Sequence, residues 1–343
     1  MSPRLPALVA AVQANCAISD ARFARELSLC NYLLAMREYF RWENDLPLDV
    51  APPRGEVARW IAEREALWDA VEGADWEALP LGAGACDPFA ARDANAALAG
   101  DRLVYGAAVG RFGKPSFFLG RLERRETRSG VDVVEVGCEY ARDIDAAPAA
   151  YQDGTVVFRR EAFERWLWMR TEAWEASGGA AMGAALAAYG FADERAAALA
   201  RMAEGERETL VLHELGEHAA GQRLGEPWEA FMAANADRRV ELFARAVRDL
   251  LADCLVTLPA LVERGAAPSL HFWRANFGGL REALFPRLVA AFSLWGATGR
   301  AEAIAEAAAA GRGHWERVAA DLTAAGAPDA RRLARDPEAI ALA

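Results

Sequence analysis

Cysteine and histidine are scarce in this sequence, with five cysteines and four histidines among 343 residues. The cysteines are dispersed and include no Cys-x-x-Cys pair, which argues against a disulfide or zinc-finger framework. An odd, scattered set of this kind is typical of reduced thiols in a cytoplasmic protein.

Long apolar runs and a surplus of positive charge are also missing. No segment approaches the roughly 18–20 apolar residues that a membrane-spanning helix needs. The 39 Lys and Arg residues against 50 Asp and Glu residues give a net charge of −11, which argues against broad binding to DNA or RNA. The apolar stretch 5–12 is short and follows a single arginine, so we interpret it as a helix and not as a signal peptide. We therefore expect a cytoplasmic protein with no membrane or nucleic-acid partner.

Common catalytic signatures are absent as well. The chain has no Gly-x-x-x-x-Gly-Lys-Ser/Thr loop and no Gly-x-Ser-x-Gly elbow. The glycines at 106–113 lack the strand–turn–helix context of a dinucleotide-binding loop. The sequence therefore assigns no nucleotide site and no particular substrate.

The hydrophobic pattern that is present changes its period twice along the chain. Residues 1–101 and 160–343 have a helical pattern, whereas residues 102–159 contain short β-branched and aromatic segments separated by Gly, Pro and Asp. We predict a mainly α protein with a small inserted antiparallel β-sheet, which is an α+β fold. The two helical regions are expected to pack together as one bundle-like body.

Individual elements follow from the same pattern. We predict a helix at 5–18, a longer one that Asp20 caps and that ends near 43, and a third at 56–71. A tight turn is expected at Arg128-Ser129-Gly130. The predicted strands occupy residues 103–109, 116–122, 131–137 and 155–158.

The segment 26–43 predicts a buried helix that carries polar side chains. Apolar residues occupy both sides of this helix, so we expect it to lie inside the protein, with Asn31 and Glu38 on one stripe. A buried carboxylate must be neutral, paired or bound to a metal, because a bare charge is costly to bury. Two roles are open for Glu38: a structural ion pair with Arg37 or Arg41, or a ligand or catalytic role.

The segment 210–222 concentrates histidine and glutamate. On a helix, Glu214 reaches Glu217 at i+3 and His218 at i+4, so these three potential ligands share about one face. His213 pairs with Glu217 at i+4 on the adjoining side. Such a cluster is either a metal site or a solvated charged face.

This cluster is close to two zinc motifs and matches neither. His-Glu-x-x-His requires a histidine at 217 and His-x-x-Glu-His requires one at 214, and both positions are glutamate. A di-iron or di-manganese centre between helices fits the carboxylate-rich composition better, with Glu38 from one helix and Glu214, Glu217 and His218 from another. The Glu-x-x-His pairs of that class are absent, since Glu214 and His218 are four residues apart.

A third segment, 269–282, has His271 and Arg274 among aromatic residues on a predicted helix. His271 is either an additional ligand or a core histidine that a neighbour satisfies. Arg274 has the geometry to bind a carboxylate or a phosphate. We take Asn31, His271 and Arg274 as candidate cofactor-binding residues.

Two of these stretches resemble an uncharacterised bacterial protein family. They are Cys-Asn-Tyr-Leu-Leu-Ala-Met-Arg-Glu-Tyr at 30–39 and His-Glu-Leu-Gly-Glu-His at 213–218. The likeness covers most of the chain, and it implies no particular activity.

The leading hypothesis is a metal-dependent enzyme with an oxidase- or oxygenase-like reaction on a small organic substrate. Glu38 and Glu214 are its catalytic candidates, and carboxylates with imidazole suit Fe or Mn. Zinc-dependent hydrolysis with Glu214 as the base is one alternative, and a non-enzymatic binding or assembly protein without a metal is another. A homo-oligomer is compatible with each. The candidate metal ligands are Glu38, His213, Glu214, Glu217 and His218.

Overall fold

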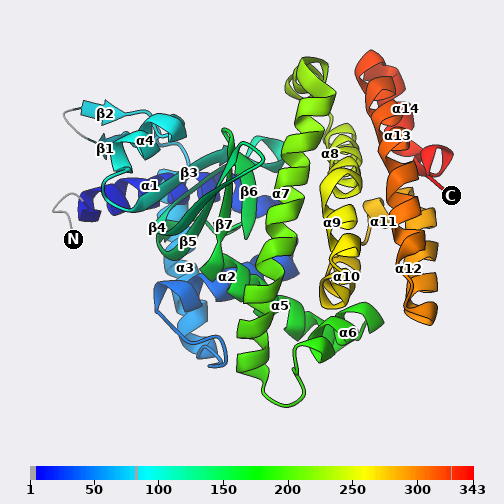
Figure 1. The fold of residues 1–343 in the computed structure, drawn as a ribbon. Helices are drawn as coiled ribbons and strands as arrows, with labels where there is room; N and C mark the ends of the chain where they lie inside the picture. The colour runs from blue at the N-terminus through cyan, green and yellow to red at the C-terminus, as the bar shows by residue number, and fades with distance from the viewer. Residues whose placement is uncertain (1–4, 82–83, 326) are drawn as a thin grey trace. The chain divides into compact units, whose positions relative to one another are not determined.

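The computed structural model describes residues 5–81, 84–325 and 327–343, apart from the side chains at 111, 327 and 328 (Figure 1). The chain divides into two compact units, Met1–Glu172 and Ala173–Ala343, and the helix α5 (Arg160–Ser177) carries the boundary. The predicted fold class is confirmed, because helices dominate both units and one five-stranded and one two-stranded sheet accompany them.

The first predicted helix begins at Leu5 and the second ends at Glu43 as expected, but the first continues to Phe23 and the second starts only at Leu29. Ser28 caps the second helix, with its side chain accepting a hydrogen bond from the Asn31 N–H at 3.4 Å. Asp20, the predicted cap, lies instead inside the first helix and is fully buried. The helices before the sheet are α1 (Leu5–Phe23), η1 (Ala24–Glu26), α2 (Leu29–Glu43), α3 (Arg54–Val71) and α4 (Ala91–Leu98).

The five-stranded sheet has the order β3-β4-β5-β7-β6. All the predicted strands are present, and the predicted turn joins β4 to β5 with Ser129 and Gly130 at φ of 50° and 81°. The sheet is not wholly antiparallel as expected, because β7 pairs with β5 in the parallel direction. The strands are β1 (Leu79–Leu81), β2 (Gly84–Cys86), β3 (Leu103–Val109), β4 (Pro115–Arg128), β5 (Val131–Arg142), β6 (Ala149–Gln152) and β7 (Thr155–Arg159).

All the described secondary structure of the C-terminal unit is helical. Its longest helix, α7, has a break at Gly225, whose φ is 64°. No described helix in either unit combines the length and apolar character that crossing a membrane requires. The elements are α6 (Ala180–Ala188), α7 (Arg195–Ala234), α8 (Arg238–Ala252), η3 (Asp253–Thr257), α9 (Leu258–Glu263), α10 (Ala267–Ala275), α11 (Leu280–Leu284), α12 (Pro286–Thr298), α13 (Glu302–Ala324), α14 (Ala327–Arg335) and η4 (Pro337–Ile340).

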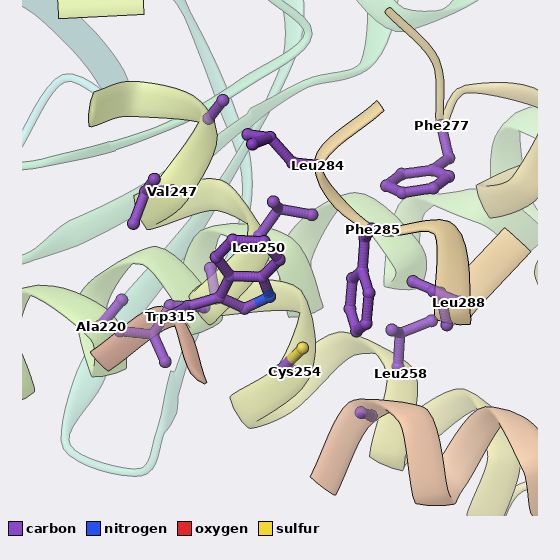
Figure 2. Packing of buried hydrophobic residues seen from close by; sticks show 14 of the residues in the cluster. Ala220, Val247, Leu250, Cys254, Leu258, Phe277, Leu284, Phe285, Leu288 and Trp315 are labelled. Carbon is purple, nitrogen blue, oxygen red and sulfur yellow. The ribbon is translucent and has the colours of Figure 1, made fainter. Parts of the chain in front are cut away.

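The core of the C-terminal unit surrounds η3, which is a single π-helical turn. Figure 2 shows Cys254 of this turn beside Phe285 and Trp315, whose ring centroids are 5.5 Å apart. Gly311 makes this packing possible, because a Cβ at that position would lie 2.6 Å from the Cys254 sulfur. This packing fixes the position of η3, which also carries the buried residue Asp253.

Candidate metal centre

Two side chains of α7, His213 and Glu217, lie one helical turn apart on the same face. The Nε2 atom of His213 and the Oε1 atom of Glu217 are 3.8 Å apart. Asp249 of α8 joins them, so that one ligand atom from each residue lies within 4.8 Å of the other two. Within the described part of the chain, this is the one set of three potential ligands that lies so close together. All three side chains are partly exposed, and solvent therefore reaches the group.

Asp253 fixes the orientation of His213. Its Oδ1 lies 2.9 Å from His213 Nδ1, so the imidazole donates from Nδ1 and keeps Nε2 on the side of Glu217. A carboxylate on the second nitrogen is the usual support of a metal-bound histidine. Asp253 is 1% exposed and opens the π-helical turn, a distortion that often occurs at functional sites.

Gly216 brings the two halves of the group together. A Cβ on this glycine would lie 2.6 Å from the carbonyl oxygen of Ala252, which is the residue before Asp253. The absence of a side chain therefore lets α7 approach the end of α8 closely. This approach places His213 and Glu217 against Asp249 and Asp253.

Neighbouring cations oppose the negative charge of the group. Burial by itself would lower the pKa of His213, but the Asp253 carboxylate raises it to about 10. Burial also raises the pKa of Glu217, against the opposing effect of Arg248. The Arg248 guanidinium lies 2.8 Å from Glu217 Oε1 and 3.5 Å from Asp249 Oδ1. A proton on His213 and the charge of Arg248 therefore offset part of the negative charge of Glu217, Asp249 and Asp253.

Two carboxylate oxygens of the group remain poorly satisfied. Asp249 Oδ1 and Asp253 Oδ2 are buried, and neither accepts a hydrogen bond of normal length and angle from a described residue. Each has an ion-pair contact at 3.5 Å, with Arg248 and with Arg281 of α11 respectively. An under-satisfied buried oxygen costs free energy, which a cation bound at Asp249 would recover.

The structure brings His213 and Glu217 of the predicted ligand set together. Glu214 is 8% exposed and His218 is half-buried on the same helix. Neither residue belongs to a described set of three ligand atoms within 4.8 Å of one another. Their assignment as metal ligands therefore stays a prediction.

The two candidates on α10 make contacts elsewhere in the C-terminal unit. The ring of His271 lies against Trp295, with 4.5 Å between the centroids, and burial lowers the pKa of His271. Arg274 donates hydrogen bonds to the Phe277 carbonyl at 2.9 Å and to Glu282 at 2.7 Å. Both residues thus have structural partners, and their role in binding a cofactor stays a prediction.

Glu38 and Asn31 belong to the N-terminal unit. Glu38 is 2% exposed; Arg37 donates to its Oε1 at 2.9 Å, and Arg41 Nε lies 3.3 Å from its Oε2. This is the structural ion pair that the sequence left open as one role. Asn31 is exposed, contrary to the predicted burial, because the first turns of α2 lie at the surface. A metal site that combines Glu38 with residues of α7 stays a prediction.

Sequence reasoning missed the two aspartates of this group. Asp249 and Asp253 are four residues apart within the apolar segment 247–258. Two carboxylates on one stripe of a buried helix are unusual and indicate a paired or ligand-binding role. The i,i+4 spacing of Asp249 and Asp253 in an apolar segment was therefore the sequence feature that could have identified them.

Comparisons with known proteins agree with the resemblance noted in the sequence. Residues 7–159 match the model of a family's N-terminal domain, and residues 164–340 match the model of the same family's C-terminal domain. No curated protein and no solved structure matches the chain. The predicted likeness to an uncharacterised family over most of the chain is confirmed: this protein belongs to the DUF6866 family, a family of unknown function.

Proposed function

We propose that the protein is a metal-dependent enzyme whose C-terminal unit binds one divalent ion through His213, Glu217 and Asp249. The observation that carries the proposal is the convergence of the three ligand atoms within 4.8 Å. The contact of Asp253 with His213 Nδ1 supports it, because it directs the other nitrogen toward the site. One imidazole and two carboxylates suit Fe, Mn or Zn, and three protein ligands leave positions open for water or substrate.

The bound metal decides the proposed chemistry. With Fe or Mn, the reaction is oxidase- or oxygenase-like on a small organic substrate. With Zn, it is a hydrolysis, because zinc lowers the pKa of its bound water. A cytoplasmic location is part of the proposal, since all five cysteines are free thiols.

A non-enzymatic binding protein is the second candidate. The observation that favours it is the position of Arg248, which already neutralises Glu217 and Asp249. In that case the group is a structural ion network that holds α7 against α8.

Elemental analysis of protein purified without a His-tag separates the two candidates. The proposal expects near-stoichiometric Fe, Mn or Zn in the wild type and in the control His314→Ala, and loss of the metal in His213→Ala. A wild type that stays metal-free after anaerobic reconstitution with each ion contradicts the proposal and favours the structural network.

The same measurement tests the ligands that the sequence predicted. We expect Glu38→Gln and His218→Ala to retain the metal, because neither residue belongs to the described ligand set. Loss of the metal in a folded Glu38→Gln variant would instead support the predicted site that includes Glu38.

A further inference from the structure

A cavity of about 460 Å³ lies in the N-terminal unit, lined by the end of α1, by η1, by the first residues of α2 and by α3. This volume falls in the range of about 300–1,000 Å³ that is usual for small-molecule sites. Nothing in the proposed metal chemistry uses these residues. The polar and aromatic residues that line it are Asp20, Arg25, Tyr32, Glu65, Trp68 and Asp69.

The cavity has one carboxylate without a cationic partner. Asp69 pairs with Arg25 at 2.7 Å. Asp20 contacts Lys114 at 3.3 Å and accepts a hydrogen bond from the Ile144 N–H. Glu65, which is exposed at the mouth of the cavity, accepts a hydrogen bond from the Tyr32 hydroxyl at 2.7 Å and has no ion-pair partner among the described residues. A single positive charge on a ligand would therefore complement the cavity.

The aromatic residues of the cavity favour an organic cation. Tyr32 and Trp68 both line it, and an ammonium group is attracted to the faces of such rings. Trp68 is 6% exposed, and its buried Nε1–H has no hydrogen-bond partner among the described residues. An unpaired buried donor costs free energy that an acceptor atom would recover.

We propose that this cavity binds a small organic amine that also carries an oxygen acceptor, as an amino alcohol does. The ammonium group pairs with Glu65 beside the rings of Tyr32 and Trp68. The ligand oxygen accepts a hydrogen bond from Trp68 Nε1. This cavity shares no residue with the proposed metal site, so the two are tested separately.

Calorimetric titration of the full chain with choline tests the charge requirement. Binding by the wild type is expected to weaken by at least about tenfold in Glu65→Gln, which keeps an acceptor for Tyr32 but removes the charge. The matched control Glu63→Gln, an exposed position on the same helix, should bind as the wild type does. No choline binding by the wild type, or equal binding by Glu65→Gln, would overturn the proposal.

A second ligand tests the oxygen acceptor. Trp68→Phe keeps an aromatic ring and removes the N–H, so it should weaken binding of choline but leave binding of tetramethylammonium, which has no oxygen, nearly unchanged. Equal effects on both ligands would contradict the assigned hydrogen bond. The melting temperature of each variant checks that the N-terminal unit remains folded.

Discussion

Asp253 Oδ1 lies 2.9 Å from Nδ1 of His213, and this contact joins the π-helical turn η3 to the middle of α7. It determines which nitrogen of the imidazole is free to bind a metal. The contact places Asp253 behind the proposed ligand set of His213, Glu217 and Asp249. The proposed metal site is therefore supported by a buried residue of η3.

Asp253→Asn tests this support. The asparagine retains the size of the side chain but loses the charge that orients and polarises His213, so we expect metal affinity to fall by about 10–100-fold. Competition with a chromogenic chelator measures the change. Asp329→Asn, an exposed position on α14, is the control. Unchanged affinity in Asp253→Asn would show that the contact does not serve a metal.

Gly216→Ala should weaken the proposed metal site although it changes none of the ligands. Its new Cβ would lie 2.6 Å from the Ala252 carbonyl oxygen, so α7 and α8 must move apart. We expect a loss of about 1–3 kcal/mol of unfolding free energy together with weaker metal binding. Gly221→Ala on the same helix is the matched control, because nothing lies within 4 Å of its added Cβ. Urea unfolding measures both variants, and equal stability of the two would refute the close-approach argument.

Arg248→Met should strengthen metal binding. The guanidinium contacts Glu217 and Asp249, so it competes with a bound cation for the same carboxylates. Removing it is expected to increase affinity by about tenfold or more, because like charges then no longer oppose each other. Arg245→Met, which breaks a pair with Glu241 on the same helix, should leave affinity unchanged. Weaker binding in Arg248→Met would mean that Arg248 supports the site.

A pH-dependent stability is expected from Glu206 of α7. Burial raises the pKa of this carboxyl, although hydrogen bonds from Thr209, Tyr189 and Ser269 oppose the shift. The folded state therefore holds the proton more tightly than the unfolded state. This contribution is complete below the ordinary carboxyl range and is lost as the pH rises through the raised pKa.

Glu206→Gln removes that titration and keeps an acceptor for Tyr189. We expect its unfolding free energy to vary less between pH 5 and pH 8 than that of the wild type, and to exceed it at the upper end. Urea titrations across this range measure the difference, with Glu208→Gln as the control. A parallel pH dependence in Glu206→Gln and wild type would rule out Glu206 as the source.

The sheet shows how far local pattern predicts this fold. The strands at 131–137 and 155–158 were predictable because they are rich in β-branched and aromatic residues. β6 (Ala149–Gln152) was not, since Ala-Ala-Tyr-Gln has no β-branched residue and pairing with β7 determines its conformation. The parallel pairing of β5 with β7 depends on tertiary topology, which spacing alone does not reveal.

Of the candidate metal site, only the pair of residues on α7 was predictable from the sequence. The i,i+4 spacing relates His213 to Glu217 wherever α7 packs. The face of α7 that carries Gly216 approaches the Ala252 carbonyl at the end of α8, and on that face His213 and Glu217 lie close to Asp249. Asp249 comes from another helix, so no spacing within 210–222 could supply it.

The most direct test of the metal centre is anomalous diffraction from crystals of the full chain soaked in Zn²⁺ and recorded at the zinc edge. The account predicts one peak about 2.0–2.2 Å from His213 Nε2 and from carboxylate oxygens of Glu217 and Asp249, with Arg248 displaced from both carboxylates. Crystals without a peak at this position, with Arg248 still bridging Glu217 and Asp249, would contradict it.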